Sequence, residues 1–206
     1  HLFSDQWKKK RCAVETMFLA KLGLNNRIFA RKCLIQEVSV HDKNTFLQQY
    51  HIQGEDKSKF AFGLYFDDEL VAIMTFRSPR YNSQYNWELM RFCCKKGITV
   101  VGGFSKLLQH FRKNYTGSIV SYADRTYSNG DVYRKNNFQL TNTSRPSYWY
   151  VNTNTETRMH RSYYTKKRML ELIKATKKTN KSEDEISKDL KLEKLWNCGT
   201  LTFVLS

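Results

Sequence analysis

The stretch that decides the fold runs from Gly102 to Phe138 and reads GGFSKLLQHFRKNYTGSIVSYADRTYSNGDVYRKNNF. Three apolar residues follow its glycine pair at helical spacing: Leu107, Leu108 and Phe111. This spacing predicts an amphipathic helix that begins at the glycines. The run 118–123 is short, apolar and partly β-branched, and it predicts a buried strand. Asp124 falls at the carboxyl end of that strand, where open α/β sheets place their ligands.

The rest of the stretch predicts a turn and a second helix. Ser128-Asn129-Gly130 has the composition of a turn, Tyr133 follows it, and Asn136-Asn137 closes the helix. Two interpretations remain open. One is a piece of core with a single polar strand end, and the other is a phosphate-binding helix start that faces Asp124 and Tyr133 across a cleft.

Four short motifs, in this order, resemble the cofactor core of the GNAT acyltransferase fold and, more narrowly, its Mom-like branch of phage proteins. They are Glu88-Leu-Met-Arg91-Phe92, Gly102-Gly-Phe-Ser105-Lys106, Ser121-Tyr-Ala-Asp124 and Gly130-x-x-Tyr133. The resemblance covers about residues 35–151. It implies an α+β fold, with a mixed, mostly antiparallel central sheet flanked by helices. The charge and periodicity of the residues outside this range predict basic helical extensions at both ends. The founding member of the branch modifies adenine in DNA, and similar domains occur in phage homing endonucleases.

The glycine loop departs from the usual GNAT pattern, Gln/Arg-x-x-Gly-x-Gly/Ala. Thr99 or Val100 stands where Gln or Arg is expected, and Phe104 or Ser105 stands where the last small residue is expected. This departure counts against ordinary acyl-CoA binding.

Acyl transfer needs a group that manages the proton and donors for the developing oxyanion. Asp124 is the candidate to accept a proton or to orient the amine. Arg91 is the candidate to polarise the acyl group. Alternatively, Arg91 has a purely structural role and pairs with Asp124 or Glu88. By resemblance, Tyr133 protonates the leaving thiolate, and Tyr50-His51 takes the place of a His-Tyr pair of Mom-like proteins in reversed order. The expected cofactor is acetyl-CoA or another acyl-CoA, bound at the helix start: Gly102, Gly103, Phe104, Ser105 and Lys106.

The charge of the chain predicts a polyanionic partner. Lys and Arg total 35 against 19 Asp and Glu, for a formal net charge of +16 and a pI near 9.7. Nucleic acid, and double-stranded DNA in particular, is the expected partner, and mere solubility is the alternative. The predicted contact residues are Lys8, Lys9, Lys10, Arg11, Arg77, Arg80, Arg158, Arg161, Lys166, Lys167 and Arg168, continued by Lys174, Lys177, Lys178 and Lys181.

The sequence disfavours a membrane partner and a metal site. The sequence has no run of about 18 apolar residues, so a membrane is not the expected partner. Five scattered cysteines without a metal-binding spacing predict free thiols, no metal site and a reducing compartment, the host cytoplasm for a phage protein. A nuclease domain or another phage protein is a further expected partner.

Periodicity and turn residues predict the remaining elements. We expect Trp7–Leu22 to be a helix with a basic first turn and Asn86–Cys94 to be a strand with Trp87, Leu89 and Arg91 on one face. The other expected helices and strands are Arg27–Val38, His41–Tyr50, Lys59–Phe66, Glu69–Phe76, Phe138–Leu140, Ser147–Val151, Ser182–Leu190 and Leu195–Leu205, with Arg158–Arg168 in a further helix. The expected units are residues 1–34, a GNAT-like domain of residues 35–151, and a basic extension of residues 152–206.

Three functions remain open. The first is a Mom-like enzyme that modifies a nucleobase amine, and the second is a non-catalytic DNA-binding module from the carboxyl-terminal part of a phage homing endonuclease. The third is an ordinary N-acetyltransferase.

Overall fold

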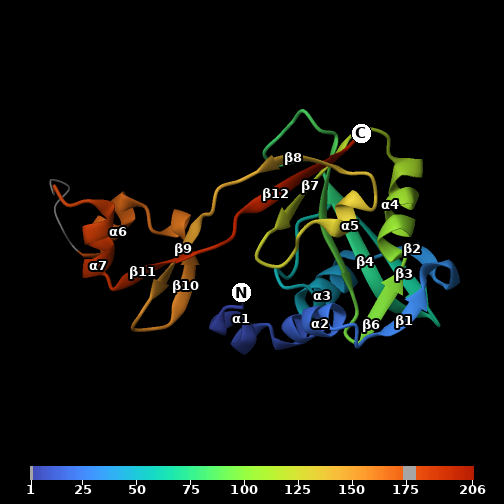
Figure 1. Ribbon diagram of the computed structural model, residues 1–206, viewed down its shortest axis with the longest axis horizontal. Coiled ribbons are helices and arrows are strands. Elements are labelled where there is room, and N and C mark those ends of the chain that lie inside the picture. The colour runs from blue at the N-terminus through green and yellow to red at the C-terminus, as the bar shows by residue number, and fades with distance from the viewer. Residues whose placement is uncertain (1, 174–179) are drawn as a thin grey trace.

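A seven-stranded sheet forms the larger of two lobes (Figure 1). The structure is a computed structural model that describes residues 2–173 and 180–206. In sheet order the strands are β2 (Leu34–Glu37), β3 (Phe60–Phe66), β4 (Glu69–Arg77), β5 (Trp87–Cys94), β7 (Ile119–Asp124), β12 (Thr200–Leu205) and β8 (Gln139–Thr143). Every neighbouring pair is antiparallel except β5 with β7. The expected fold class, a mixed and mostly antiparallel sheet flanked by helices, is confirmed.

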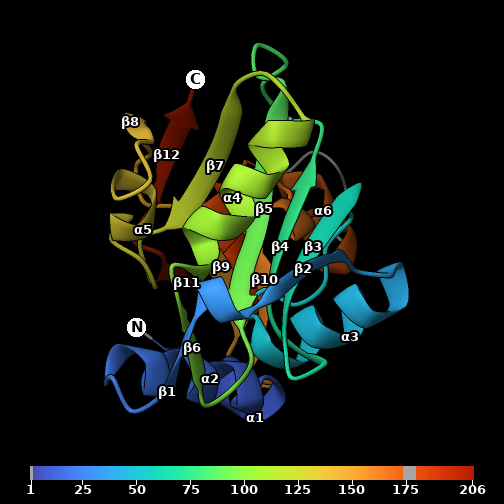
Figure 2. The same ribbon diagram turned by 90° about the vertical axis from the view of Figure 1, so that its right-hand side faces the viewer.

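Helices cover both faces of this sheet (Figure 2). On one face, α4 (Gly103–Asn114) presents Phe111, whose ring stacks on Phe76 with centroids 3.6 Å apart. On the other face, α3 (Val40–Tyr50) packs Phe46 and Leu47 against Ile73. The second helix predicted within residues 102–138 is short, because α5 spans only Asp131–Arg134.

A β-bulge in β5 changes the faces predicted for its side chains. The register against β4 steps from Thr75–Arg91 to Phe76–Leu89, so Met90 is the extra residue. Leu89 and Phe92 therefore both belong to the core beneath α4, whereas Arg91 turns to the α3 face. The prediction that Arg91 shares a face with Leu89 is wrong, because strict alternation assumes a strand without a bulge.

The N-terminal segment is also broken into more pieces than predicted. Instead of one helix there are α1 (Ser4–Lys9) and α2 (Arg11–Lys21), with Lys10 between them in a non-helical conformation. Lys8 and Lys9 thus lie in the last turn of α1, where the helix dipole favours cations. The expected basic first turn is wrong for this reason. Beyond α2, β1 (Asn26–Phe29) pairs in parallel with β6 (Ile98–Val101), and η1 (Ala30–Lys32) separates β1 from β2.

A smaller lobe is inserted between β8 and β12. Its sheet contains β10 (Thr157–His160), β9 (Tyr148–Asn152) and β11 (Leu192–Trp196), and its helical segments are η2 (Arg161–Tyr163), α6 (Lys166–Leu172) and α7 (Glu183–Asp189). Its own core is formed by Tyr150, Met169, Ile186 and Leu192. The predicted helix over residues 158–168 is divided between β10, η2 and α6. Lys174, Lys177 and Lys178 lie outside the described residues.

The first helix links the two lobes. Arg158 of β10 pairs with Asp5 of α1 at 3.2 Å, and its guanidinium lies 4.0 Å from the ring centroid of Phe3 and 4.7 Å from that of Trp149. On the body side, the amide of Gln6 and the hydroxyl of Tyr127 are hydrogen-bonded at 2.7 Å. A contact chain therefore runs from the small lobe through α1 to the end of β7.

Candidate active site

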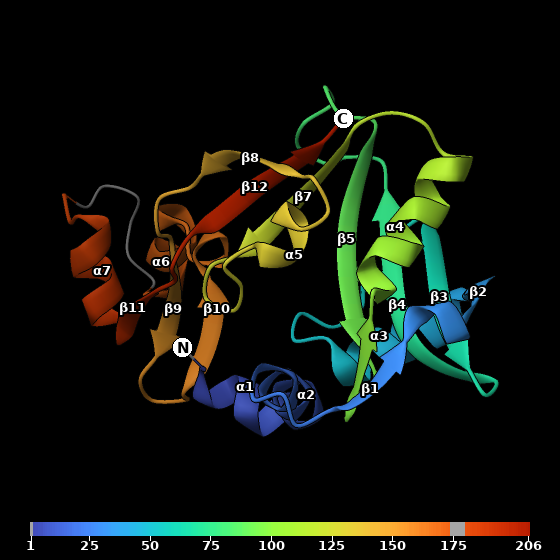
Figure 3. The ribbon, with the colours of Figure 1, turned by 45° about the vertical axis from the view of Figure 1, so that its right-hand side comes forward.

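The two parallel strands of the large sheet separate at their carboxyl ends (Figure 3). Strand β5 pairs with β7 only from Trp87 to Leu89, opposite Ile119 to Ser121. Beyond that point β5 continues to Cys94 and β7 continues to Asp124, but the two strands no longer pair with each other. The separation exposes the backbone edge of β5 from Met90 onward, an edge whose polar groups can bind an extended ligand.

A pocket of about 200 Å³ fills this separation and is here called the splay pocket. Its walls come from both strands, from the loop after α3, from the first turn of α4 and from α5. The residues that line it are His51, Ile52, Gln53, Met90, Arg91, Phe92, Phe104, Tyr122, Ala123, Asp124, Tyr127, Ser128, Val132 and Tyr133. The structure thus brings together four of the predicted catalytic residues: Arg91, Asp124, Tyr133 and His51.

The phenol of Tyr133 is held near the point where the strands part. The Ser121 hydroxyl donates to the Leu89 carbonyl at 2.9 Å, and the Tyr133 hydroxyl lies 3.0 Å from the same Ser121 oxygen, to which it can donate. The Tyr133 ring stacks on Phe203 at 4.9 Å and meets Phe104 edge-on at 5.7 Å. Burial raises the pKa of Tyr133 above its ordinary value, so the phenol is protonated at neutral pH.

Arg91 brings a buried cation to the pocket. Its Nη1 donates to the Met90 carbonyl at 2.8 Å, and its buried Nε has no hydrogen-bond partner among the described residues. Burial lowers the pKa of Arg91, but a guanidinium stays charged at any physiological pH. A buried donor without a partner is costly, and the Arg91 side chain lines the splay pocket.

Asp124 lies at the expected strand end. One carboxylate oxygen accepts from the Thr126 amide at 2.8 Å, and its backbone carbonyl accepts from Tyr127 and Ser128. The side chain is therefore oriented by the turn that follows β7, and it lines the splay pocket from the side opposite Met90 and Arg91.

His51 and Tyr50 separate in space although they are adjacent in the chain. His51 lines the splay pocket, and its Nδ1 accepts from the Gln53 amide at 3.2 Å. Burial and the neighbouring Arg91 charge lower the pKa of His51 to about 3, so the imidazole is neutral and carries its proton on Nε2. Tyr50 packs edge-on against Phe46 at 4.8 Å and lines neighbouring hollows instead.

The start of α4 has internal partners for two of its predicted cofactor residues. Ser105 Oγ donates to Asn136 Oδ1 at 2.6 Å, and Lys106 Nζ donates to the carbonyls of Ala30 and Cys33 at 2.9 and 2.5 Å. Gly102 has a left-handed backbone with φ of 78°. A Cβ on Gly103 would lie 3.1 Å from Val100, so only glycine fits there without displacement. Of the five residues, Phe104 alone lines the splay pocket.

Many of the predicted nucleic-acid contacts have acidic, carbonyl or aromatic neighbours within the chain. Lys8 pairs with Glu156 and Arg11 with Glu15, both at 2.9 Å, and Arg77 pairs with the buried Glu88 at 3.0 Å. The other neighbours are Gln48 for Lys10, Tyr81 for Arg80, Tyr148 for Arg161 and Tyr163 for Arg168. Lys9, Lys166 and Lys167 are exposed.

Sequence reasoning missed two contributions to the site. Ser121 begins one of the quoted motifs without a role of its own, and the structure makes it the partner of the Tyr133 hydroxyl. Gln53 is not singled out by the sequence, and it lines the splay pocket. The signal for Ser121 is a hydroxyl in a strand that is otherwise apolar, three residues before Asp124. No sequence signal places Gln53 opposite Asp124, because the two residues are 71 positions apart in the chain.

No helix in residues 2–173 or 180–206 is long and apolar enough to span a membrane. Across the same residues, no group of His, Cys, Asp and Glu side chains is arranged to hold a metal ion. All five cysteines are free, and Cys33 is buried.

Neither a protein-family model nor a curated protein sequence matches the chain. Solved acetyltransferase structures are similar to it. A Bacillus subtilis acetyltransferase in complex with CoA is 11% identical, with a TM-score of 0.47 over 85% of this chain and 99% of the other. Arabidopsis thaliana Naa50, bound to a bisubstrate analogue, is 13% identical, with a TM-score of 0.49 over 85% and 99%.

A GNAT family acetyltransferase from Elizabethkingia anophelis with acetyl-CoA bound is 9% identical, with a TM-score of 0.47 over 85% of this chain and 98% of the other. The strand order and register of the chain itself define its fold.

Proposed function

We propose that this protein is a GNAT-type acyltransferase that uses acetyl-CoA or another acyl-CoA. The observation that carries the proposal is the separation of β5 from β7 after Leu89, which leaves a backbone edge along a pocket. The pantetheine arm of an acyl-CoA is an extended chain with two amide groups, and such a chain can hydrogen-bond to an open strand edge as an added strand does. When bound, the cofactor supplies an activated thioester.

The side chains around the splay pocket fit acyl transfer. With an acyl-CoA bound, the guanidinium of Arg91 would be the donor for the acyl oxygen, where negative charge would develop. Tyr133, which is protonated and lies 3.0 Å from Ser121 Oγ, would supply the proton that the thiolate needs. Asp124 orients the acceptor amine and accepts its proton. His51 is neutral, with Nδ1 already accepting from Gln53, so it positions the acceptor through Nε2–H and takes no proton.

We further propose that the acceptor is an amine of a DNA base, as in a Mom-like modification. The net charge of +16 supports a polyanionic substrate. Tyr122 and Tyr127 line the pocket and offer aromatic faces to a base. A base in a duplex must leave the stack to reach the pocket, and extrusion costs a few kcal/mol.

A second candidate function is a non-catalytic DNA-binding module, such as the end of a phage homing endonuclease. The internal partners of Ser105 and Lys106 favour it, because these two side chains are not directed at a cofactor. An ordinary N-acetyltransferase is a third candidate, and the charge of the chain disfavours it.

Calorimetric titration with CoA and with acetyl-CoA, with and without duplex DNA, tests the proposal. We expect micromolar cofactor binding that is retained in Asp124→Asn, which removes the charge while keeping an acceptor for the Thr126 amide. Tyr133→Phe keeps the ring contacts, and we expect it to lower transfer by about 10²–10⁴-fold. Modified nucleosides in treated DNA are the product to look for.

Absence of cofactor binding together with tight, salt-dependent DNA binding would establish the non-catalytic module instead. Transfer to peptide amines without transfer to DNA would establish the ordinary N-acetyltransferase.

A further inference from the structure

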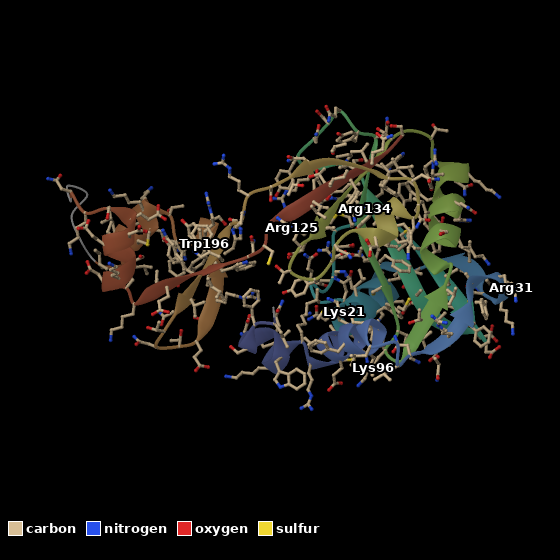
Figure 4. The ribbon with its side chains drawn as sticks, viewed as in Figure 1. Lys21, Arg31, Lys96, Arg125, Arg134 and Trp196 are labelled. Atoms are coloured by element: carbon tan, nitrogen blue, oxygen red, sulfur yellow. The ribbon has the colours of Figure 1, made fainter. Side chains whose placement is uncertain are left out.

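A second hollow adjoins the splay pocket and has a different character. It measures about 750 Å³ and opens beside the turn after β7, between that turn and α2. Three cations line it, from elements far apart in the chain: Lys21 at the end of α2, Arg125 directly after Asp124, and Arg134 of α5 (Figure 4). We call it the basic hollow.

The cations of the basic hollow lack counter-charges within it. No acidic side chain is among its described lining residues, and the remaining walls are Thr126, Tyr127, Ser128, Asn129 and Leu201. Within residues 2–173 and 180–206, neither the Lys21 ammonium nor the Arg125 guanidinium has a hydrogen-bond or ion-pair partner. Three like charges around one hollow repel one another unless an anion enters. Arg134 lies 3.5 Å from the Asp131 carboxylate, outside the hollow, whereas Lys21 and Arg125 differ from Lys8, Arg11 and Arg77, which are paired internally.

Arg134 is held in place to receive such an anion. Its Nη1 donates to the Asn129 carbonyl at 2.6 Å, and its guanidinium lies 5.3 Å from the ring centroid of Phe203. Its other nitrogens can donate into the hollow. A guanidinium fixed in this way matches the paired oxygens of a phosphate group better than a flexible ammonium does.

The basic hollow and the splay pocket share a wall. Tyr127 and Ser128 line both, so a ligand group in one lies next to a ligand group in the other. This geometry suits a nucleotide, whose planar base and charged phosphate are joined by one sugar.

We propose that the basic hollow binds a backbone phosphate of the polynucleotide acceptor, next to the nucleotide whose base enters the splay pocket. The inference rests on the proposed nucleic-acid acceptor and adds to it a phosphate site at Lys21, Arg125 and Arg134. It assigns to phosphate binding three cations that composition and charge runs did not single out.

Fluorescence anisotropy tests the site, with labelled single-stranded and duplex DNA of about 20 nucleotides at salt concentrations from about 50 to about 300 mM. The variant is Lys21→Gln/Arg125→Gln, because both side chains are exposed and lack partners in the described chain. Arg31→Gln is the matched control: Arg31 is an exposed cation at the far end of the body (Figure 4).

Each lost phosphate contact flattens the plot of log K against log salt by about 0.9 for duplex and about 0.7 for single-stranded DNA. Because the hollow binds one phosphate, we expect the double variant to flatten the duplex slope by about 0.9 and to weaken binding by more than about tenfold at low salt. We expect Arg31→Gln to change neither quantity by more than about a factor of two. CoA affinity, measured in parallel, should be the same for all three proteins.

An unchanged salt slope in the double variant, alongside DNA binding by the wild type, overturns the phosphate site and leaves the proposed function standing. Loss of CoA affinity with DNA affinity unchanged also overturns it, since the hollow then serves the cofactor. If the wild type binds CoA but no DNA, both the nucleic-acid acceptor and the phosphate site fail while acyl transfer survives.

Discussion

At the scale of single residues, the centre of the body contains a buried ion pair that shapes the site. Lys43 of α3 and Asp56 lie 3.1 Å apart, with side chains only 4% and 1% exposed. The Thr75 hydroxyl also donates to Asp56, at 2.5 Å. Burial by itself would raise the pKa of Asp56, but the hydrogen bonds from Thr75, Ser58 and Lys43 hold it below its ordinary value. These bonds fix the segment after α3, which includes His51 and Gln53, against the sheet.

We predict that Lys43→Met destabilises the protein by about 3–5 kcal/mol, because it leaves the Asp56 carboxylate buried without its cation. Urea denaturation at neutral pH measures the loss. Lys43→Met/Asp56→Leu is the control, and it should recover part of the stability by removing the orphaned charge. Equal stability of the wild type and Lys43→Met would show that the pair does not hold the segment.

The imidazole of His51 predicts a pH dependence. Its folded-state pKa is about 3, below the value of about 6.5 in an unfolded chain. Between these values the unfolded state binds the extra proton, so stability falls as the pH drops from about 6.5 towards about 3. We expect His51→Asn to lose stability less steeply over that range, by up to about 1.4 kcal/mol per pH unit. Denaturation at successive pH values measures the slopes, and equal slopes would place the imidazole in solvent.

At the scale of elements, the start of α5 requires a glycine at position 130. Gly130 caps α5 with a φ of 85°, and a Cβ there would lie 2.4 Å from the Phe203 ring. That ring is fully buried and stacks on Tyr133, so it cannot move aside without displacing the phenol of the site.

We predict that Gly130→Ala costs more than about 2 kcal/mol, from left-handed strain together with the clash. Gly23→Ala is the matched control, since Gly23 has a similar φ of 69° but no atom within 4 Å of the added carbon. It should show the strain alone, about 1 kcal/mol. Thermal denaturation compares them, and similar melting temperatures would mean that the Phe203 ring adapts.

At the scale of the whole molecule, the docking of the small lobe depends on Arg158. This side chain is 10% exposed, pairs with Asp5 and lies between the rings of Phe3 and Trp149. Its guanidinium is engaged within the chain, and its expected contact with nucleic acid stays a prediction. Its position makes α1 a bridge between the lobes.

We predict that Arg158→Lys, which keeps the charge but loses the planar stacking, weakens the docking of α1 by about 1–2 kcal/mol. Hydrogen exchange in residues 4–9 should then accelerate by about tenfold. Arg161→Lys, at an exposed cation beside Tyr148, should leave that exchange unchanged. If both variants exchange alike, the lobe docks by other contacts.

Much of the fold follows from the sequence by local rules. The Asp67-Asp68 turn, with φ of 49° and 59°, and its two strands are where periodicity and turn residues predict them. The apolar face of α4, the strand that ends at Asp124 and the helix capped by Ser182 are likewise local features of the chain. Such elements depend on neighbouring residues, which a sequence displays directly.

Pairing between strands that are distant in the chain is visible only in the folded structure. Residues 148–152 and 200–205 both have the pattern of strands, yet β9 joins the small lobe while β12 returns between β7 and β8. The bulge at Met90 reverses the face of Arg91, and Glu156, Glu15 and Asp5 pair with Lys8, Arg11 and Arg158, whose expected DNA contacts stay predictions. Local sequence patterns predict the hairpin of β3 and β4, the apolar face of α4, the fold class and the excess of positive charge. Which strands meet, which cations remain unpaired and which side chains share a pocket depend on contacts between distant residues, whose free energies exist only in the folded chain.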